Sequence, residues 1–186
     1  MQKQPSITTQ RLLLRPFVFA DAARVAELAG DPLIADTTLN IPHPYTVSEA
    51  KRWIKRHTAL WYEGRGLEYA IVRLEDNLLI GDITLRINRA YDSGEIGYWV
   101  GTPFWNQGYC TEAVSALIDF GFKKLDLNRI YGFYLTRNPS SRRVMEKSDM
   151  VYEGTFRQSI KKDGQYEDCG VCAILRDDFL ARQESS

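Results

Sequence analysis

The chain has 186 residues, and its 44% hydrophobic and 26% charged residues are typical of a globular protein, so we expect residues 1–186 to form a single domain around one core. The 24 Lys and Arg residues balance the 24 Asp and Glu residues, which leaves no excess positive charge to neutralise nucleic-acid phosphates. No apolar run approaches the length of a membrane span and the first residues hold no secretory apolar segment, so we expect a cytoplasmic protein whose partners include neither nucleic acid nor a membrane.

Three elements are predicted in the N-terminal third of the chain. Residues 8–15 (TTQRLLLR) have the pattern of a strand. Residues 21–30 have the helical spacing of small apolar side chains, and Pro32 is expected to help stop this helix. The capping box TVSE at residues 46–49 predicts one longer helix that begins there and ends at Gly64.

The rest of the chain predicts a mostly antiparallel sheet with helices packed on it. Six strands are indicated by short β-branched and aromatic runs between turn residues: 67–74, 78–88, 95–100, 129–136, 152–161 and 166–175. Two helices are expected, one after Gly108 with a buried stripe at i, i+3 and i+4 positions, and a short one from Asn138 to Met145. Strands crowd together with few helices between them, which indicates a mixed α+β class in which residues 95–136 form the one parallel crossover.

The loop GTPFWNQGYC at residues 101–110 leads into the longest predicted helix without a break. A helix start presents unpaired N–H groups and the positive end of the helix dipole, and Gly108 leaves room for a ligand to approach the backbone closely. The loop lacks the Gly-Lys-Ser/Thr of a Walker motif and the three glycines of a dinucleotide fingerprint. It therefore predicts an anion site for a phosphate-bearing ligand, with an ordinary strand-to-helix turn as the alternative.

The three cysteines are odd in number, which argues against a disulfide framework. Cys169 and Cys172 are three residues apart in a predicted strand, so their side chains point to opposite faces. Neither His43 nor His57 has ligand spacing relative to the cysteines. We therefore expect small core cysteines and no metal site.

Three segments, GEIGYWV, WNQGYCTEAV and NRIYGFYLTRNPSSRRVMEK, resemble in order and spacing the core of the GNAT superfamily of acetyl-CoA-dependent N-acetyltransferases. The segments TTQRLLLRPF and GQYEDCGVCAILRDDF resemble its ribosomal-protein N-terminal acetyltransferase branch, so the likeness covers nearly the whole chain. It implies a sheet with helices on both faces that is splayed between the strands at 95–100 and 129–136, with the pantetheine of acetyl-CoA lying in the gap.

The resemblance also implies which residues hold acetyl-CoA. Main-chain groups near Val100 would pair with the pantetheine, and Asn138 matches a family asparagine that hydrogen-bonds the same arm. The pyrophosphate would lie on the N–H groups of Gln107, Gly108, Tyr109, Cys110 and Thr111. Trp105, Asn106 and Cys110 depart from the residues usual in the family. Asparagine tolerates a left-handed backbone, and the thiol is expected to weaken or shift the cofactor contact at most.

Acetyl transfer to an amine needs a neutral amine, a stabilised oxyanion and a proton for the departing thiolate. An α-amino group has a pKa of about 7.7–8.0 and a lysine amine has a pKa of about 10.4, so a general base deprotonates the α-amino group more easily. Strand alternation puts Glu95 on the same face as Trp99, and this glutamate is our candidate base, directly or through a water. The N–H of Val100, which the splay would leave unpaired, is the candidate oxyanion donor.

The remaining catalytic candidates stay open. Ser141 follows Asn138 in the first turn of the short helix and matches a family serine that is a proposed general acid in this branch. Other members use a tyrosine, which makes Tyr134 the alternative, and a serine at a helix start can instead cap free N–H groups or touch the pantetheine. A solvated or salt-bridged carboxylate is the alternative for Glu95, and other candidate bases are Glu112, Glu167 and Asp168.

Aromatic and acidic residues are candidates to line the acceptor entrance. The aromatic candidates are Trp61, Tyr62, Tyr98 and Trp99. The acidic candidates between residues 21 and 49, opposed only by Arg24, are Asp21, Glu27, Asp31, Asp36 and Glu49. If this stretch flanks the entrance, as the family fold implies, it favours cationic amines or basic peptide termini.

We therefore predict direct acetyl transfer from acetyl-CoA to a primary amine, with the N-terminal amine of a protein such as a ribosomal protein as the favoured acceptor. A small amine (a polyamine, an amino sugar or an amino-acid-like compound) is the first alternative acceptor. A non-catalytic acyl-CoA-binding module is the alternative from a different class. The sequence leaves the identity of the acceptor open, and also whether the chain forms a homodimer.

Overall fold

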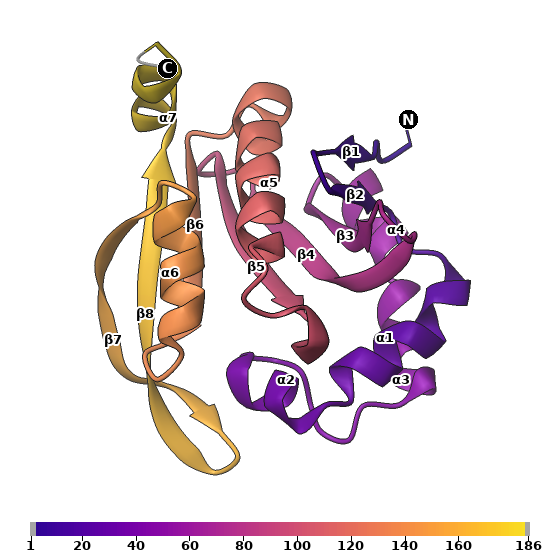
Figure 1. The fold of residues 1–186 in the computed structure, drawn as a ribbon. Coiled ribbons are helices and arrows are strands. Elements are labelled where there is room, and N and C mark those ends of the chain that lie inside the picture. Colours follow the sequence, from indigo (N-terminus) through magenta and orange to yellow (C-terminus); the bar gives the residue numbers. More distant parts are fainter. Residues whose placement is uncertain (1–2, 185–186) are drawn as a thin grey trace.

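The computed structural model describes residues 3–184 and contains one eight-stranded sheet in the order β1-β2-β3-β4-β5-β6-β8-β7 (Figure 1). The strands are β1 (Ile7–Thr8), β2 (Leu12–Arg15), β3 (Gly66–Arg73), β4 (Leu78–Asn88), β5 (Ser93–Val100), β6 (Arg129–Leu135), β7 (Val151–Lys162) and β8 (Gln165–Leu175). Only β5 and β6 pair in parallel, and all other neighbours are antiparallel. The predicted mixed, mostly antiparallel sheet with a parallel crossover at 95–136 is confirmed.

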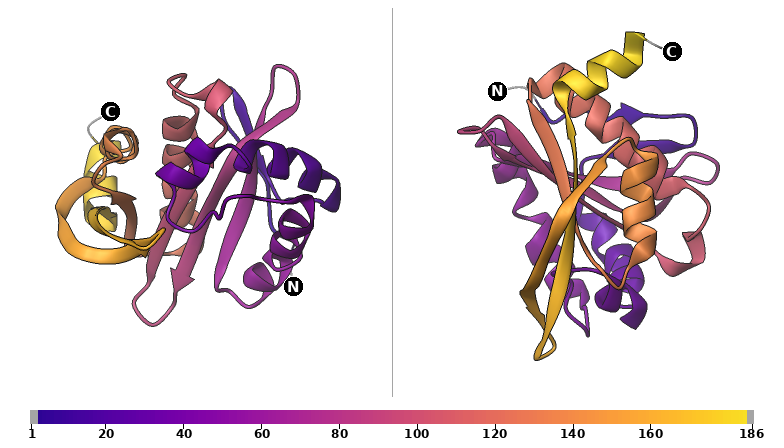
Figure 2. Two further views of the ribbon diagram at one scale, coloured as in Figure 1. Left: turned by 90° about the horizontal axis from the view of Figure 1, so that it is seen from below. Right: turned by 90° about the vertical axis from the view of Figure 1, so that its left-hand side faces the viewer.

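Helices cover both faces of the sheet, as expected (Figure 2). They are α1 (Ala22–Ala29), α2 (Pro32–Thr37), α3 (Val47–Ile54), α4 (His57–Tyr62), α5 (Tyr109–Leu125), α6 (Pro139–Lys147) and α7 (Arg176–Glu184), with 3₁₀ turns at Phe19–Asp21 and Thr102–Phe104. A Cβ built at Gly121 of α5 would lie 2.6 Å from Ile130 and 3.4 Å from Leu85, so α5 packs closely on the face to which these two side chains point. On each strand, the residues that alternate with Leu85 or Ile130 point to the opposite face of the sheet, where α1 and α3 lie.

Strands β5 and β6 pair over only three residue positions, from Ser93 opposite Arg129 to Glu95 opposite Tyr131. Beyond Glu95 the two strands diverge, which confirms the expected splay (Figure 1). The N–H of Gly101 donates to the carbonyl of Ile80 at 2.9 Å on the β4 side. Because main-chain groups alternate between the two edges of a strand, those of Val100 point away from β4 and toward the gap.

Two predicted elements are each divided in the structure. Residues 8–15 form a small hairpin, because a turn from the N–H of Thr9 to the carbonyl of Leu12 (2.9 Å) separates β1 from β2. The long helix expected between residues 46 and 64 breaks into α3 and α4. The break lets the His57 ring pack edge-on against Trp53, with 4.3 Å between ring centroids, and both rings contact Phe17.

Sequence reasoning gave no helix at 32–37 or 176–184. The sequence predicts that Pro32 helps stop a helix, and this prediction is wrong: Pro32 occupies the first turn of α2, where a missing N–H is harmless. The carboxylate of Asp31 caps this helix by accepting the N–H of Leu33 at 2.9 Å. The Asp-Pro pair was therefore a start signal that we read as a stop.

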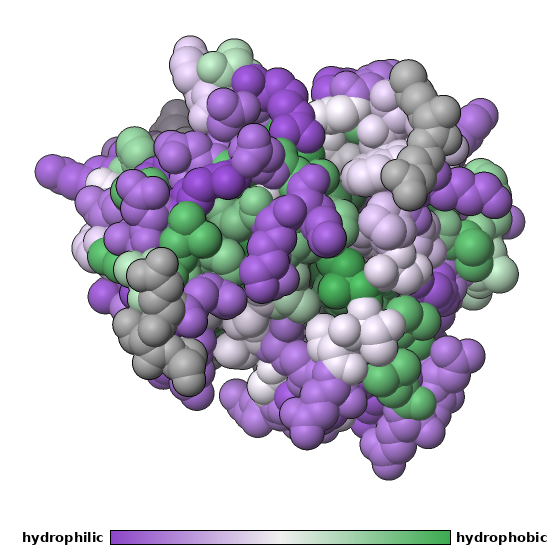
Figure 3. Space-filling model, turned by 90° about the horizontal axis from the view of Figure 1, so that it is seen from above, coloured by the Kyte–Doolittle hydropathy of each residue, from purple (hydrophilic) through white to green (hydrophobic). Residues whose placement is uncertain are grey.

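The core is concentrated in β2–β5 and under α5. Its largest fully buried side chains are Tyr69, Leu12, Leu14, Ile34, Leu67, Ile71, Ile80, Ile83, Leu85, Ile96, Leu117 and Leu127. The face seen from above in Figure 3 is largely hydrophilic, with hydrophobic residues in separate patches. None of the helices within residues 3–184 has the length and apolar character needed to cross a membrane.

Candidate active site

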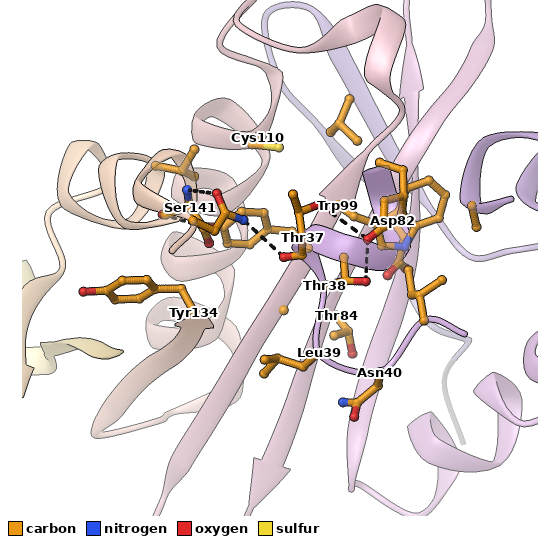
Figure 4. A pocket seen from close by; sticks show the side chains of 18 of the residues that line it. Thr37, Thr38, Leu39, Asn40, Asp82, Thr84, Trp99, Cys110, Tyr134 and Ser141 are labelled. Atoms are coloured by element: carbon orange, nitrogen blue, oxygen red, sulfur yellow. Dashed lines mark hydrogen bonds between the residues drawn. The ribbon is translucent and has the colours of Figure 1, made fainter. Parts of the chain in front are cut away.

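A cleft of about 1170 Å³ runs through the gap between β5 and β6 and is lined by side chains from both halves of the sheet (Figure 4). On the α5 and α6 side it is bordered by Cys110, Tyr134 and Ser141. On the α1 and α3 side it is bordered by residues of β3 and β4, among them Glu68 and Asp82. The gap therefore connects two chemically different compartments.

The predicted anion loop has the backbone that a phosphate cradle requires. Gly108 has a φ of +80° and is the N-terminal cap residue of α5, and Asn106 has a φ of +60°, which confirms the expectation that asparagine here adopts a left-handed conformation. Gly108 has no side chain to cap the helix, so the first N–H groups, from Tyr109 to Thr111, have no partner from a cap. These groups face the cleft that Gly108, Cys110 and Thr111 line.

Contacts that sequence reasoning missed hold this loop in place. The guanidinium of Arg11 donates to the carbonyl of Gln107 at 3.0 Å and to the carboxylate of Glu112 at 2.7 Å. Its side chain also lies over the ring of Tyr109. The indole N–H of Trp105 donates to the carbonyl of Val100 at 2.5 Å, which ties the loop to the end of β5. Arg11 lies inside the strand that the sequence predicts at residues 8–15, and only the turn between β1 and β2 brings it to the loop.

Glu112 has a structural role in the protein. It accepts hydrogen bonds from the hydroxyl of Thr9 at 2.6 Å and from the N–H of Arg11 at 2.8 Å, as well as the guanidinium contact. Burial raises the pKa of this carboxyl, but the hydrogen bonds from Thr9 and Arg11 outweigh it, and the net pKa is lowered. The carboxylate thus fastens the first hairpin to α5.

Ser141 lies beside the gap and is paired with a tyrosine. The hydroxyl of Tyr98 lies 2.9 Å from the carbonyl oxygen of Ser141 and 3.1 Å from its Oγ. Burial is the largest cause that raises the pKa of Tyr98, so its phenol stays protonated. Figure 4 shows the side chain of Tyr134 directed away from Ser141 and the middle of the pocket. Of the two candidate proton donors, Ser141 has the more favourable placement.

Asn138 caps α6, a role that we had considered for Ser141. The Oδ1 of Asn138 accepts the N–H of Ser141 at 3.2 Å, and its Nδ2 donates to the carbonyl of Thr37 at 3.1 Å. The neighbouring Arg137 binds Asp36 at 2.9 Å. These contacts tie the end of α2 to the start of α6. The hydroxyl of Ser141 is therefore not needed as a helix cap.

The other predicted bases differ in how closely their carboxylates contact neighbouring residues. Glu95 lies 3.3 Å from Arg86, and at about 3.4 Å per residue it is about 17 Å from Val100 along β5. Glu167 binds Arg137 at 2.9 Å, and Asp168 accepts the N–H of Gln158 at 2.8 Å. Glu95 thus keeps one long contact, whereas the other two carboxylates are held by close partners.

Each acidic side chain that we considered between residues 21 and 49 has an ion-pair or hydrogen-bond partner within the chain. Its carboxylates bind, in order, Arg15 (2.8 Å), Arg24 (2.8 Å), Thr102 (2.6 Å), Arg137 (2.9 Å) and Thr46 (2.7 Å). Tyr98 and Trp99 line the cleft as expected, but Trp61 and Tyr62 do not belong to its lining. The acids that line the cleft are Asp36, Glu49, Glu68, Asp82 and Glu95. Of these, Glu68 and Asp82 are the buried ones, and sequence reasoning placed them inside strands without assigning a role.

The comparisons with known proteins agree with this geometry. Residues 11–151 match the family model described as acetyltransferase (GNAT) domain. The chain belongs to the GNAT family. It is 33% identical over 176 residues to the protein named uncharacterized N-acetyltransferase YnaD of Bacillus subtilis, covering 93% of this chain and 98% of YnaD. It is an acetyl-CoA-dependent N-acetyltransferase, which sets aside the alternative of a non-catalytic module.

Other GNAT proteins of known name differ in their acceptors. The spermidine N(1)-acetyltransferase of Vibrio cholerae is 27% identical over 107 residues, which cover 57% of this chain and 62% of that protein. The solved structure of RimL, described as a ribosomal L7/L12 alpha-N-protein acetyltransferase in complex with coenzyme A, superimposes with a TM-score of 0.86 at 20% identity, covering 94% of this chain and 99% of RimL. These likenesses establish the fold of the GNAT domain and leave its acceptor to be inferred from the site.

Replacement of Gly108 by valine is predicted to abolish acetyl-CoA binding, because an added Cβ would lie 3.4 Å from the guanidinium of Arg11 and the branched side chain would crowd this contact that holds the loop. Valine at a φ of +80° also strains the backbone by about 1–2 kcal/mol. Gly64 has a φ of +65° and nothing within 4 Å of an added Cβ, so Gly64→Val is a control that incurs a similar strain away from the cleft. We expect both variants to melt at lower temperature and only Gly108→Val to lose calorimetric affinity, by at least about tenfold. Equal affinities in the two variants would contradict the phosphate-cradle assignment.

Proposed function

We propose that this enzyme transfers the acetyl group of acetyl-CoA directly to a primary amine that enters the gap from the α1 and α3 side. The observation that carries the proposal is the gap itself, because it joins the N–H groups at the start of α5 to an acidic pocket on the opposite face. Cofactor and acceptor can then approach the same point from opposite faces without a covalent enzyme intermediate.

On the cofactor side, the chain offers groups for each part of acetyl-CoA. The pyrophosphate would be held by the N–H groups from Gln107 to Thr111, next to the positive end of α5. The main chain of Val100 points toward the gap and would pair with the pantetheine or donate its N–H to the oxyanion. Burial raises the pKa of Cys110 to about 12, so this residue contributes a neutral thiol to the wall.

Proton transfer would use one residue on each side of the reacting carbon. Glu95 would accept the proton of the amine only through a chain of several waters, since about 17 Å of strand separates it from Val100. Ser141 would donate a proton to the departing thiolate, with its hydroxyl oriented by Tyr98. Because burial keeps the Tyr98 phenol protonated, its role here is to position the serine hydroxyl.

The acceptor belongs to one of two classes. The resemblance to the ribosomal-protein branch and the low pKa of α-amino groups, about 7.7–8.0, favour the N-terminal amine of a protein. The buried Glu68 and Asp82 on the acceptor side favour a cationic small amine. Both classes fit direct transfer, and they differ in what the acidic pocket would bind.

A screen of thiol release tests the reaction class. Purified enzyme and acetyl-CoA are mixed with peptides that have free N-termini, with small monoamines and with diamines, and free coenzyme A is measured over time. We expect at least one primary amine to accelerate release above the amine-free rate, with the acetylated amine detected by mass spectrometry. If every amine leaves the rate at the amine-free level, the proposed transfer is wrong.

Ser141→Ala is predicted to lower kcat by about a hundredfold, within the range of about 10²–10⁴ typical of acid catalysis, with acetyl-CoA affinity nearly unchanged. Ser140→Ala is the matched control, because Ser140 is an exposed residue of the same cleft whose hydroxyl accepts a hydrogen bond from Arg143 and not from Tyr98. Since Asn138 provides the cap, neither variant should melt more than slightly below the wild type. A Ser141→Ala enzyme with near-normal kcat would remove the serine from the mechanism.

Glu95→Gln is predicted to depress turnover most at low pH, where the acceptor amine is hardest to deprotonate, while acetyl-CoA affinity stays the same. The substitution also weakens the exposed contact to Arg86. Glu153→Gln, which removes the comparable surface pair with Arg129, serves as the control for that loss. A pH–rate profile of Glu95→Gln that superimposes on those of the wild type and the control would assign Glu95 a structural role only.

A further inference from the structure

Two carboxylates are buried in the face of the sheet that lies toward α1 and α3. Glu68 of β3 is 5% exposed and Asp82 of β4 is 4% exposed, and both line the cleft. Within residues 3–184, neither carboxylate is in an ion pair within 4.0 Å. Acidic side chains are almost never this deeply buried without a charged partner.

The hydrogen bonds of the pair are incomplete. The hydroxyl of Thr84 lies 3.0 Å from Glu68, and it also lies 3.1 Å from the carbonyl of Leu67, so one proton serves two acceptors. The Oδ1 of Asp82 is buried and has no hydrogen-bond partner within the described chain. A buried, unpaired carboxylate oxygen destabilises a fold unless something binds it. One such unpaired oxygen, beside a second buried carboxyl whose only side-chain hydrogen bond is shared, indicates a ligand site in the cleft.

The position of the pair relative to the gap fits an acceptor. Asp82 is directly opposite Trp99 in the β4–β5 ladder, and Glu68 is directly opposite Thr84 in the β3–β4 ladder, so all four side chains share one face. Trp99 immediately precedes Val100, whose main chain points toward the gap. With strands about 4.8 Å apart, the carboxylates lie one to two strand spacings, roughly 5–10 Å, from the gap. Figure 4 shows Asp82 across the pocket from Ser141 and Tyr134.

Some of the other charged groups of this pocket pair with one another, and the charge of Arg86 also offsets part of the rise in the pKa of Glu68 and of Asp82. Arg86 of β4 binds Glu95 of β5 at 3.3 Å, and Arg52 of α3 lies 3.9 Å from Glu49 of the same helix. Arg56, also near Glu68, exerts only a distant attraction. The phenol of Tyr45 is neutral, because burial first and then the charge of Asp82 raise its pKa to about 12. His57, behind the pocket on α4, is neutral because burial lowers its pKa to about 4.

The protonation states of Glu68 and Asp82 are those expected of a site that binds a cation. Burial raises the pKa of Glu68 to about 7, and burial followed by repulsion from Glu68 raises the pKa of Asp82 well above its usual range. Without a bound cation, the two carboxyl groups therefore retain protons near neutral pH. A bound ammonium would favour the charged carboxylates and expel those protons.

We propose that Asp82 and Glu68 bind a second cationic group of the acceptor, so that the enzyme acetylates a small amine that carries another ammonium group a few methylenes away. The inference rests on the proposed direct transfer and names its substrate class. The reactive amine would lie at the gap beside Val100, and the second ammonium would lie against Asp82, beside the indole of Trp99. The buried position of the pair suits a slender alkyl chain better than the N-terminus of a folded protein.

The experiment compares the diamine putrescine with the monoamine n-butylamine in the thiol-release assay. For the wild type we expect kcat/KM to favour putrescine by at least about tenfold. Asp82→Asn and Glu68→Gln should shrink that preference mainly by raising the KM for putrescine, with the KM for acetyl-CoA unchanged. Glu75→Gln makes the same chemical change in the exposed turn between β3 and β4 and should keep the wild-type preference.

The pH dependence adds a signature that a purely structural pair would lack. Between pH 6 and 8 putrescine stays cationic, since an alkyl amine such as that of lysine has a pKa of about 10.4. Its KM should fall as pH rises through the pKa of Glu68, about 7, because the charged pair binds it best. Calorimetry in buffers of different ionisation heat should detect proton release on binding. The KM of Asp82→Asn should depend less on pH.

The stability of the variants separates binding from structural roles. A carboxyl whose pKa is raised on folding loses stability as pH rises from its unfolded value, about 4, toward its folded value. Asp82→Asn should therefore melt at the same or a higher temperature than the wild type at pH 8, while it loses putrescine preference. A lower melting temperature together with unchanged preference would show that the pair is structural.

The outcomes for the two proposals are distinct. If no amine accelerates thiol release, the transfer itself fails. If amines accelerate release but putrescine and n-butylamine are used equally, the transfer stands and the second-cation site is wrong. The site is also wrong if a peptide with an N-terminal alanine and no basic side chain has a higher kcat/KM than putrescine.

Discussion

The early end of the β5–β6 ladder is the constraint on which the rest of the structure depends. The two strands pair from Ser93 to Glu95 and then diverge, although β5 continues to Val100. A parallel sheet that closed fully would consume the main-chain groups of β5 and bury the start of α5 behind packed strands. Divergence leaves main-chain groups without a partner strand and opens a cleft between a well-filled core in β2–β5 and the C-terminal strands. The cost of that opening is reduced by contacts across its mouth, such as Arg137 with Asp36.

The two faces at the gap have different chemistry because strand alternation sorts their side chains. On β5, Tyr98 points to the face of α5 and α6, where its hydroxyl meets Ser141. Its neighbour Trp99 points to the opposite face, beside Asp82. One strand thus presents a hydroxyl pair to one compartment and an aromatic wall to an acidic pocket in the other. Because this division follows from the period of a strand, a shift of β5 by one residue would exchange the two compartments.

Local patterns in the sequence were sufficient for most elements, and they failed where tertiary contacts decide. The bounds of β4 and the crossover at 95–136 follow from alternation and from the loop before α5. The break before His57 depends on aromatic packing with Trp53, which no local signal reports. Glu68 and Asp82 were visible as acids within apolar strands, but only the register of β3 on β4 brings them to one face. Asp31 and Asp36 looked available because their partners, Thr102 and Arg137, lie far away in the sequence.

A crystal structure of the enzyme with coenzyme A tests the central claim most directly, since the account assigns the gap to the cofactor. We predict the pyrophosphate within hydrogen-bonding distance of the N–H groups from Gly108 to Thr111, the pantetheine alongside Val100 and the thiol near Ser141. The face that carries Asp82 should remain open to solvent or to an amine. A cofactor that binds outside the gap, or that reaches it from the side of α1 and α3, would contradict the account.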